Sequence, residues 1–365
     1  MKSFLEVLQS VPDPRAGNVR HNLTELLVIA FLAVLCGATN CCEMAEFGRT
    51  KRRFLKRFLK LRHGTPSHDT FSNVLRALDP AALDAAFGSL TRSLMQALGG
   101  AGVVAIDGKS LKRAYDSGQS HMPSMMVTAY ATALRFTLAS RQVKGGNECE
   151  AALEVIGLLD LRGQTVTTDA LHCNRDTAAA VMAKKGDYCL VLKANQSRLH
   201  AQAQARLAEL GKRKGHAAAT SRMQAHGRGE TRTARVVAAP GAAEQHDFPG
   251  LKAFGCIETV REREAGSETD VRFFALSRVL SPQELLETAR AHWQIENGLH
   301  WVLDVVLRED AARNRKDNGP ANIAVLRRRA LDAARRDKSK GSLTIKLKRA
   351  AWDDDFLIEL LSQMR

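Results

Sequence analysis

Hydrophobic positions in the first quarter of the chain follow a helical period. Residues 23–38 are apolar nearly all round, which is typical of a helix that is buried on every side. Apolar residues at helical spacing predict a second helix over 47–62. Ser67 predicts the N-cap of a third helix, and Asp79-Pro80 predicts the start of a fourth. Residues 1–98 are therefore expected to form an all-α domain.

From residue 101 the pattern changes to short apolar runs separated by turns and helices. A strand over 103–106 ends at Asp107, and a strand over 164–168 ends at Asp169. Three more strands are expected over 124–131, 134–143 and 188–192, and helices over 147–161 and 177–185. This order predicts an α/β domain over 99–365, with an acidic residue at the end of two strands.

Residues 197–280 interrupt this alternation and are too many for a loop. They are expected to be helical and basic to about 214, and then to form strands over 230–238, 253–263 and 271–277. We interpret them as a β-rich insertion. Ser281, Pro282 and Glu284 then predict a capping box that starts a long helix reaching about residue 307.

Charge adds a preference for a polyanionic partner. The 365 residues include 54 Lys and Arg against 39 Asp and Glu, a net charge of +15. Such an excess favours nucleic acid, because each neutralised phosphate releases counterions. The alternative is a basic enzyme whose charge only keeps it in solution. Residues 308–349 form a basic helical C-terminal segment with 14 Lys and Arg and 5 acidic residues.

The helix expected over 47–62 has one strongly basic face and no acidic residue. Followed by a Gly-containing turn and another helix, it is compatible with helix-turn-helix DNA binding. A solvated basic face on a helical bundle is the alternative. The cations are Arg49, Lys51, Arg52, Arg53, Lys56, Arg57, Lys60 and Arg62.

Cysteine and apolar content argue against secretion and membrane insertion. The seven cysteines form no CxxC pair, so free thiols in a reducing cytoplasm are expected. The longest apolar run, 26–38, is shorter than the ~20 residues that a spanning helix needs. We expect neither a signal peptide nor a membrane span.

Two strand-end aspartates and a glutamate on a packing helix are the candidate chemistry. Carboxylates held close together repel one another unless a cation neutralises them. Three hard oxygen donors without a thiol suit Mg²⁺, and two such ions can assist phosphoryl displacement. Spacing alone is weak support, because any α/β protein has some Asp at strand ends.

Local sequences along nearly the whole chain resemble DDE-type insertion-sequence transposases of the H-repeat-associated group. The segments are Val11-Pro12-Asp13-Pro14-Arg15, Gly64 to Phe71, Val104 to Leu111, Asn147-Glu148, Val166 to Ala170, Leu192 to Gln196, His226 to Arg232, and Arg290 to Asn297 running on to Asp304. The resemblance implies a ribonuclease-H-like mixed sheet flanked by helices, with the β-rich insertion before the helix of the catalytic Glu.

The same resemblance implies a metal-binding catalytic triad of Asp107, Asp169 and Glu296, with Mg²⁺ as cofactor and Mn²⁺ as a substitute. It implies cleavage and strand transfer of double-stranded DNA at element ends and target, by a homodimer when DNA-bound. The expected location is the bacterial cytoplasm, associated with the nucleoid.

DNA contacts are expected at a few positions. Better-studied relatives carry a Tyr-Arg-Glu-Lys pattern on the Glu helix, of which only the Glu is kept here, since Ala289, His292 and Leu303 occupy the other positions. His292 or Arg290 is the expected replacement for the phosphate contact. The remaining candidates are Lys109, Lys193, Arg52, Arg53 and Lys56. The insertion also lacks the Trp that holds a flipped base in some relatives.

The polar stripe His292, Glu296, His300 and Asp304 has other readings. A zinc hydrolase could use it, but HExxH is absent. It could also be a polar face in solvent. Trp293 and Trp301 are interpreted as core anchors rather than base stackers.

Two other functions stay open. One is a domesticated, non-catalytic DNA-binding protein, and the other is a structure-specific nuclease on the same fold. A transposase nicks DNA in the presence of metal, whereas a non-catalytic DNA-binding protein does not. A transposase also joins a DNA end to a second duplex, whereas a nuclease does not.

Overall fold

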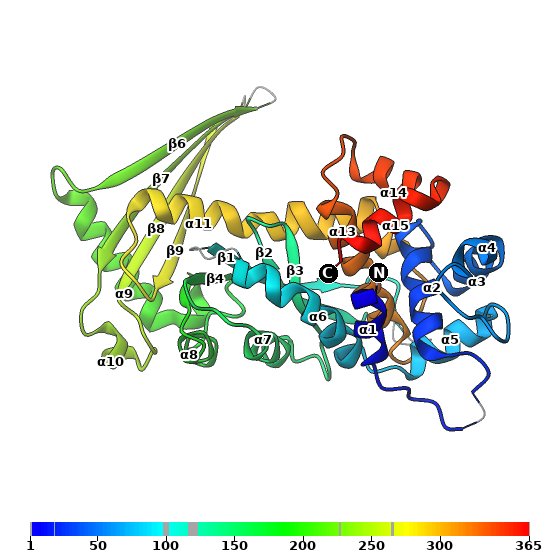
Figure 1. Cartoon of the computed structure of the whole chain (residues 1–365). Coiled ribbons are helices and arrows are strands. Elements are labelled where there is room, and N and C mark those ends of the chain that lie inside the picture. The colour runs from blue at the N-terminus through cyan, green and yellow to red at the C-terminus, as the bar shows by residue number, and fades with distance from the viewer. Residues whose placement is uncertain are drawn as a thin grey trace.

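The computed structural model describes residues 2–17, 19–97, 102–115, 123–225, 228–263 and 266–364. The strands lie in one sheet, and the helices of the two ends of the chain gather together beyond one of its edges (Figure 1). Strands β6–β9 extend the molecule at the opposite end. The protein is therefore mixed α/β, with a large mixed sheet flanked by helices.

Nine strands form the sheet in the order β3-β2-β1-β4-β5-β9-β8-β7-β6. Strands β1, β4 and β5 run parallel, and every other neighbouring pair is antiparallel. Their bounds are β1 Gly102–Ser110, β2 Met125–Ala131, β3 Phe136–Gln142, β4 Gln164–Thr168, β5 Asp187–Leu192, β6 Ala218–Ala225, β7 Arg228–Ala238, β8 Ala253–Arg263 and β9 Gly266–Leu276.

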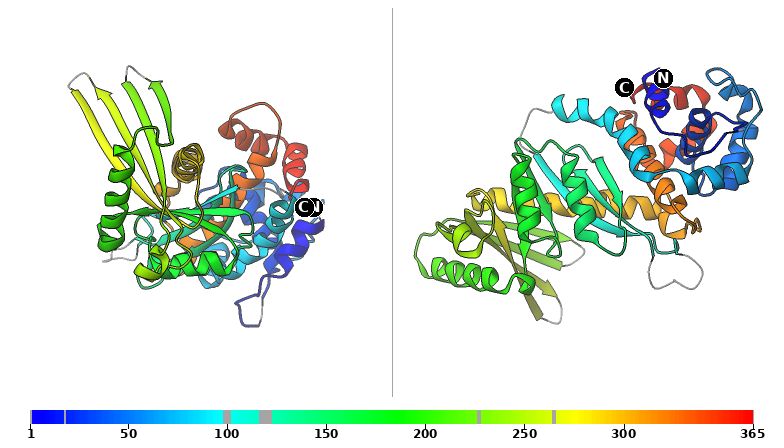
Figure 2. Two further views of the ribbon diagram at one scale, coloured as in Figure 1. Left: turned by 90° about the vertical axis from the view of Figure 1, so that its left-hand side faces the viewer. Right: turned by 90° about the horizontal axis from the view of Figure 1, so that it is seen from below.

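Both faces of the first five strands are covered. Alternate residues of a strand point to opposite faces, so Val104 and Ile106 of β1 pack into one core and Ala105 into another. Helices α7 (Glu148–Gly157), α8 (Arg175–Ala183) and α9 (Ser197–Lys212) supply the first core. The helix of Glu296 and the C-terminal helices cover the other face (Figure 2).

The β-rich segment continues the sheet rather than interrupting it. Strand β9 pairs antiparallel with β5, for example Leu190 with Ala275. The three strands expected here are present as β7, β8 and β9, and a fourth, β6, was not predicted. Its sequence, AATSRMQA, has neither the β-branched content nor the alternation that marks a strand. A short helix, α10 (Ala242–His246), connects β7 to β8.

Helices from both ends of the chain share one hydrophobic core. Helix α2 (Leu23–Leu35) is buried from Leu26 to Leu35, which confirms the helix expected to be buried on every side. The other members are α1 (Lys2–Gln9), α3 (Cys41–Thr50), α4 (Arg52–Leu55), α5 (His68–Ala77), α6 (Pro80–Ala97), α13 (Gly319–Arg336), α14 (Leu343–Trp352) and α15 (Asp354–Ser362).

The single basic helix predicted over 47–62 is wrong. Helix α3 ends at Thr50, and α4 covers only Arg52–Leu55. Tighter turns follow, and Leu61 has a positive φ of 46°, which an α-helix does not accommodate. Part of the basic surface is also neutralised, because Lys51 Nζ lies 2.7 Å from Asp354 and Arg57 pairs with Asp355 at 3.4 Å.

Several arginines of the basic C-terminal segment are buried. Arg327, Arg328 and Arg329 on α13 are at most 2% exposed. Their guanidinium groups are bound by buried partners: Arg328 by Glu309 at 3.0 Å and Arg329 by Asp84 at 2.7 Å. These charges hold the core together and are not available to a phosphate backbone.

The long helix predicted after residue 281 is present with one irregularity. Ser281 and Glu284 form the expected capping box at the start of α11 (Pro282–Gln294). A π-helical turn, η2 (Ile295–His300), joins it to α12 (Trp301–Val305), and a short 3₁₀ turn, η3 (Glu309–Ala311), follows. Among the described residues, no helix is long and apolar enough to cross a membrane.

Candidate active site

Asp107 lies within β1, not beyond its end as the sequence pattern suggested. Its side chain is 19% exposed, and one oxygen accepts a hydrogen bond from the Gly108 N–H at 2.9 Å. Nδ1 of His300, from η2, lies 3.6 Å from the other oxygen. Burial lowers the pKa of His300 to about 3, so this imidazole contacts the carboxylate as a neutral group.

Asp169 follows β4 directly and is 48% exposed. Because β1 and β4 are parallel neighbours, Asp169 is brought to the same end of the sheet as Asp107. The His172 N–H donates to an Asp169 oxygen at 3.4 Å, and Nε2 of His172 lies 3.9 Å from it. His172 is fully buried, so this turn has a fixed support.

Glu296 occupies the π-helical turn η2, which packs against β1, and its side chain is exposed. A π turn contains one residue more than an α turn and is frequent at functional sites. In this turn the Glu296 side chain is exposed, while its neighbours Ile295 and Leu299 are buried.

Glu148 is a fourth carboxylate that the sequence analysis did not select. It is the first residue of α7, and an oxygen of its side chain lies 3.2 Å from Nε2 of His172. That carboxylate fills the space beside β1 where Gly108 has no side chain, since a Cβ at Gly108 would lie 2.1 Å from its Oε1. The sequence feature that points to Glu148 is the occurrence of Asp107-Gly108 together with Asn147-Glu148.

The electrostatics of Asp107 link the four acids. Burial and, after it, the negative charges of Asp169, Glu296 and Glu148 together raise the pKa of Asp107 to about 7, against the hydrogen bond from Gly108. The acids expected from sequence are thus brought together around one buried carboxylate. Among the residues that the structure describes, no Lys or Arg forms an ion pair with Asp107, Asp169, Glu296 or Glu148.

The donor set fits a divalent cation in its chemistry. All four acids offer oxygen ligands, which Mg²⁺ prefers, and a cation would offset the repulsion felt by Asp107. Among the described residues, however, no three His, Cys, Asp or Glu side chains already converge on one ion position. The side chain of Glu296 is exposed and that of Asp169 is about half exposed, so neither carboxylate is held in a packed core.

Lys109 is not open to solvent. It is 7% exposed, and its ammonium lies 2.8 Å from Asp304, 3.0 Å from Asp310 and 3.9 Å from Glu309. Glu309 in turn binds Arg328. This network fastens β1 to α12 and η3, and it leaves Lys109 occupied by carboxylates.

Three residues of the polar stripe, His292, His300 and Asp304, contact the sheet, whereas Glu296 is exposed. His292 Nδ1 lies 3.0 Å from the Thr167 hydroxyl, and burial lowers the pKa of His292 to about 4. It is therefore neutral near pH 7. The core-anchor interpretation of Trp301 is wrong, since this ring is 58% exposed.

The other predicted DNA contacts are exposed but scattered. Lys193 follows β5 at the same end of the sheet as Asp169, and Asn195 beside it donates to the Ala170 carbonyl at 2.8 Å. Arg290 is exposed on α11. The remaining candidates, Arg52, Arg53 and Lys56, are exposed on and after α4, at the opposite end of the molecule from β6–β9 (Figure 1).

Comparisons with known proteins identify the family of the chain. The family model described as "Transposase DDE domain" matches residues 98–331, and one described as "DDE_Tnp_1-associated" matches residues 5–91. The Escherichia coli K12 protein YbfL is 31% identical over 374 residues, covering 99% of this chain and 98% of its own length.

YhhI of the same strain, named as an H repeat-associated transposase, is 31% identical over 376 residues and covers 99% of this chain and 98% of its own. A piggyBac transposase synaptic complex with hairpin DNA aligns at a TM-score of 0.41 and 10% identity, over 98% of this chain and 77% of that one, which is too distant to carry an argument. By its family match and its full-length relatives, the chain belongs to the DDE transposases of the H-repeat-associated family.

Proposed function

We propose that the protein cuts DNA at the ends of an insertion sequence and joins the freed ends to target DNA. Asp107, Asp169 and Glu296 are the metal ligands in this proposal. The observation that carries it is the buried position of Asp107, whose pKa is raised by the charges of the other acids. A buried carboxylate beside other carboxylates destabilises the folded protein unless a cation is bound, so it is expected at a site that binds a cation.

The strand order supports a ribonuclease-H-like catalytic domain over 99–365. Strands β3-β2-β1-β4-β5 form a mixed sheet with β2 antiparallel to β1, and the acids follow from β1, from the end of β4 and from the helix packed on it. Residues 1–98 are the proposed DNA-binding domain, with Arg52, Arg53 and Lys56 on its exposed surface.

Each residue of the site has a task that follows from its contacts. A bound divalent cation, Mg²⁺ or Mn²⁺, would activate the attacking oxygen and stabilise the leaving oxygen. Neutral His300 orients Asp107, and His172 orients Asp169 and Glu148. Lys109 acts as a positioning residue that holds β1 against α12. Exposed Lys193 and Arg290 are the proposed phosphate contacts on double-stranded DNA.

The test uses the full chain with a plasmid that carries its own element. Asp107→Asn, Asp169→Asn and Glu296→Gln are each expected to reduce Mg²⁺-dependent strand cleavage by about 10²–10³-fold or more, while duplex binding persists. Asp176→Asn, an exposed acid on α8, is the matched control. Normal excision by Asp169→Asn would overturn the proposal.

A joining assay addresses the alternatives. Transfer of a labelled element end to a second duplex is the expected result. Cleavage without joining would indicate a structure-specific nuclease. Binding with neither reaction would indicate a domesticated DNA-binding protein. Two labelled ends held in one complex, measured by light scattering, test the proposed DNA-bound homodimer.

A further inference from the structure

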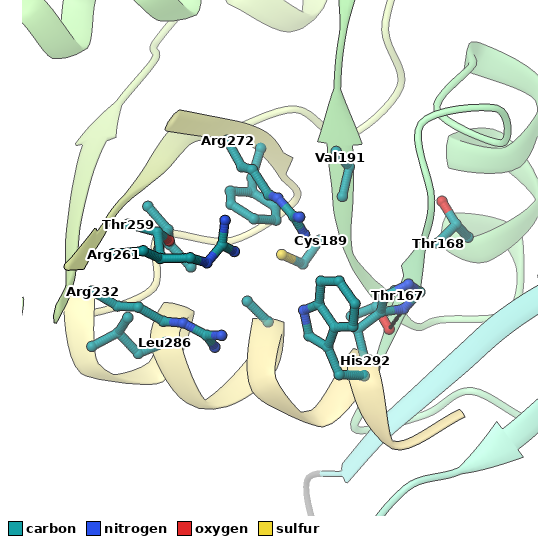
Figure 3. A pocket seen from close by; sticks show the side chains of 14 residues that line it. Thr167, Thr168, Cys189, Val191, Arg232, Thr259, Arg261, Arg272, Leu286 and His292 are labelled. Atoms are coloured by element: carbon teal, nitrogen blue, oxygen red, sulfur yellow. Dashed lines mark hydrogen bonds between the residues drawn. The ribbon is translucent and has the colours of Figure 1, made fainter. Parts of the chain in front are cut away.

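A pocket that is open to solvent lies between α11 and the sheet, where it is lined by strands β4, β5 and β7–β9 (Figure 3). It adjoins the acidic site without including it. Thr168, which lines the pocket, directly precedes Asp169, and Trp293, which also lines it, lies one helical turn before Glu296. A ligand of this pocket would therefore reach the edge of the carboxylate cluster.

Three arginines from three successive strands line the pocket: Arg232 of β7, Arg261 of β8 and Arg272 of β9. The side chains of Arg232 and Arg261 reach into the same cavity (Figure 3). Glu230 forms ion pairs with Nε of both, at 2.8 Å and 3.1 Å, and so holds the two guanidinium groups beside each other.

Arg272 is held in a different way. Its Nε lies 3.2 Å from Asp270, and its guanidinium carbon lies 4.9 Å from the centre of the Trp293 ring. Each of these three ion pairs uses Nε, and among the described residues the terminal nitrogens have no carboxylate partner, so they remain for a ligand. Parallel N–H groups of this kind match phosphate oxygens.

The remaining wall is neutral and largely apolar. Val191, Ile257, Phe274, Leu286 and Ala289 line it. His292 adds no charge, because burial lowers its pKa to about 4. Cationic groups on one side and an apolar, partly aromatic surface on the other are the features that bind nucleotides, through the phosphate and the base respectively.

A second hollow continues from the first along α11. It shares Arg232 and Leu286 with the pocket and adds Glu230 and Arg290. Since both hollows lie between a helix and a sheet, this path suits a single strand that leads away from the duplex. It provides room for nucleotides next to the one in the pocket.

We propose that this pocket binds one nucleotide of a DNA single strand, with its phosphate on Arg232, Arg261 and Arg272 and its base on the apolar wall beside Trp293. The inference rests on the proposed function, since it supplies the strand that leads to the acids. It adds a binding site for a strand end to the catalytic site.

The first experiment measures binding of fluorescein-labelled hexathymidylate to the full chain by anisotropy, in EDTA. The double variant Arg232→Ala/Arg261→Ala is expected to bind at least about tenfold more weakly, because each lost charge-assisted hydrogen bond weakens binding. Arg235→Ala is the control: it lies on the same strand, pairs with Glu258 and does not line the pocket. Equal affinity of wild type and double variant would overturn the proposal.

A second measurement needs no change to the arginines. In the Trp301→Phe/Trp352→Phe background, which removes the two strongly exposed tryptophans, the fluorescence of Trp293 is expected to change when hexathymidylate is added. An unchanged signal at saturating oligonucleotide would contradict the assigned site. An abasic hexamer that binds as tightly as hexathymidylate would overturn the role of the base.

The two proposals fail separately. Asp169→Asn is expected to keep its affinity for hexathymidylate in EDTA while it loses cleavage. If Asp169→Asn loses cleavage but Arg232→Ala/Arg261→Ala binds hexathymidylate as tightly as the wild type, the catalytic proposal stands and the nucleotide pocket is ruled out. If Asp169→Asn cleaves normally but the arginine double variant binds hexathymidylate more weakly, the nucleotide pocket stands and the catalytic proposal is ruled out.

Discussion

At the scale of single residues, the site depends on how a carboxylate is kept inside the protein near other carboxylates. Asp107 is largely buried, and among the described residues its one hydrogen bond comes from Gly108. The missing side chain of Gly108 also admits the Glu148 carboxylate. Gly108 thus donates a hydrogen bond to one acid and leaves space for the other. The pair Asp107-Gly108 therefore indicates an acidic site more specifically than an aspartate alone.

The raised pKa of Asp107 predicts a pH dependence of stability without metal. Its folded pKa of about 7 lies above the ordinary 3.8, so its contribution to stability is present below about pH 4 and is lost as the pH rises through 7. The loss is on the order of 4 kcal/mol at most. In EDTA, the unfolding temperature of the wild type should fall relative to that of Asp107→Asn between pH 5 and pH 8.

Comparison with this variant isolates Asp107, because other buried acids such as Asp332, with a pKa of about 6, are present in both proteins. Added Mg²⁺ at pH 8 should raise the unfolding temperature of the wild type more than that of Asp107→Asn. Identical pH profiles of the two proteins in EDTA would contradict the assignment of this pKa.

At the scale of elements, the helix from Pro282 to Val305 distributes its polar residues between two tasks. His292, His300 and Asp304 each contact a residue of the sheet: Thr167, Asp107 and Lys109. Glu296 alone in that stripe is exposed, at the π turn. The stripe therefore fastens the helix to the sheet and leaves one carboxylate for the site.

The start of this helix gives a prediction at the same scale. Ser281→Ala removes the oxygen that accepts from the Glu284 N–H at 3.2 Å, and it should lower the free energy of unfolding by about 1 kcal/mol. Below the unfolding transition, DNA cleavage should be unchanged, because the site lies more than a dozen residues further along. Ser281→Asp, which keeps a capping oxygen, is the control. An unfolding midpoint unchanged in Ser281→Ala would show that the cap contributes nothing.

At the scale of the whole molecule, the two ends of the chain stabilise each other and the sheet. Arg329 of α13 binds Asp84 of α6 at 2.7 Å and the Thr137 carbonyl of β3, also at 2.7 Å. Asp84 in turn accepts from the Ser140 N–H at 2.9 Å. Elements that are distant in sequence are thus joined by buried charges.

Breaking this pair should be costly. Asp84→Ala leaves the Arg329 guanidinium without its closest carboxylate in a site that is 1% exposed, and a loss of about 3–5 kcal/mol is expected from urea unfolding. Asp355→Ala removes an ion pair whose side chains are 53% and 88% exposed, so it should cost less than about 1 kcal/mol. Equal stability of the two variants would show that the buried pair is not structural.

The sequence by itself determined the features that depend on neighbours along the chain. Ser67, Asn147 and Ser281 cap helices because a side-chain oxygen reaches an N–H two or three residues away. The apolar runs of β1 and β5 mark buried strands. Asp107 and Asp169 could be selected from strand positions and Glu296 from a helix, together with the family resemblance.

Only the tertiary structure decided which charged groups are open to DNA and which strands join the sheet. Lys109 and Arg328 read as surface cations, yet both are buried, because carboxylates from distant segments neutralise them. Strand β9 lies beside β5 through pairing across some 80 residues, which no local pattern encodes. Glu148 joins the site through space left at Gly108, a property of packing rather than of spacing along the chain.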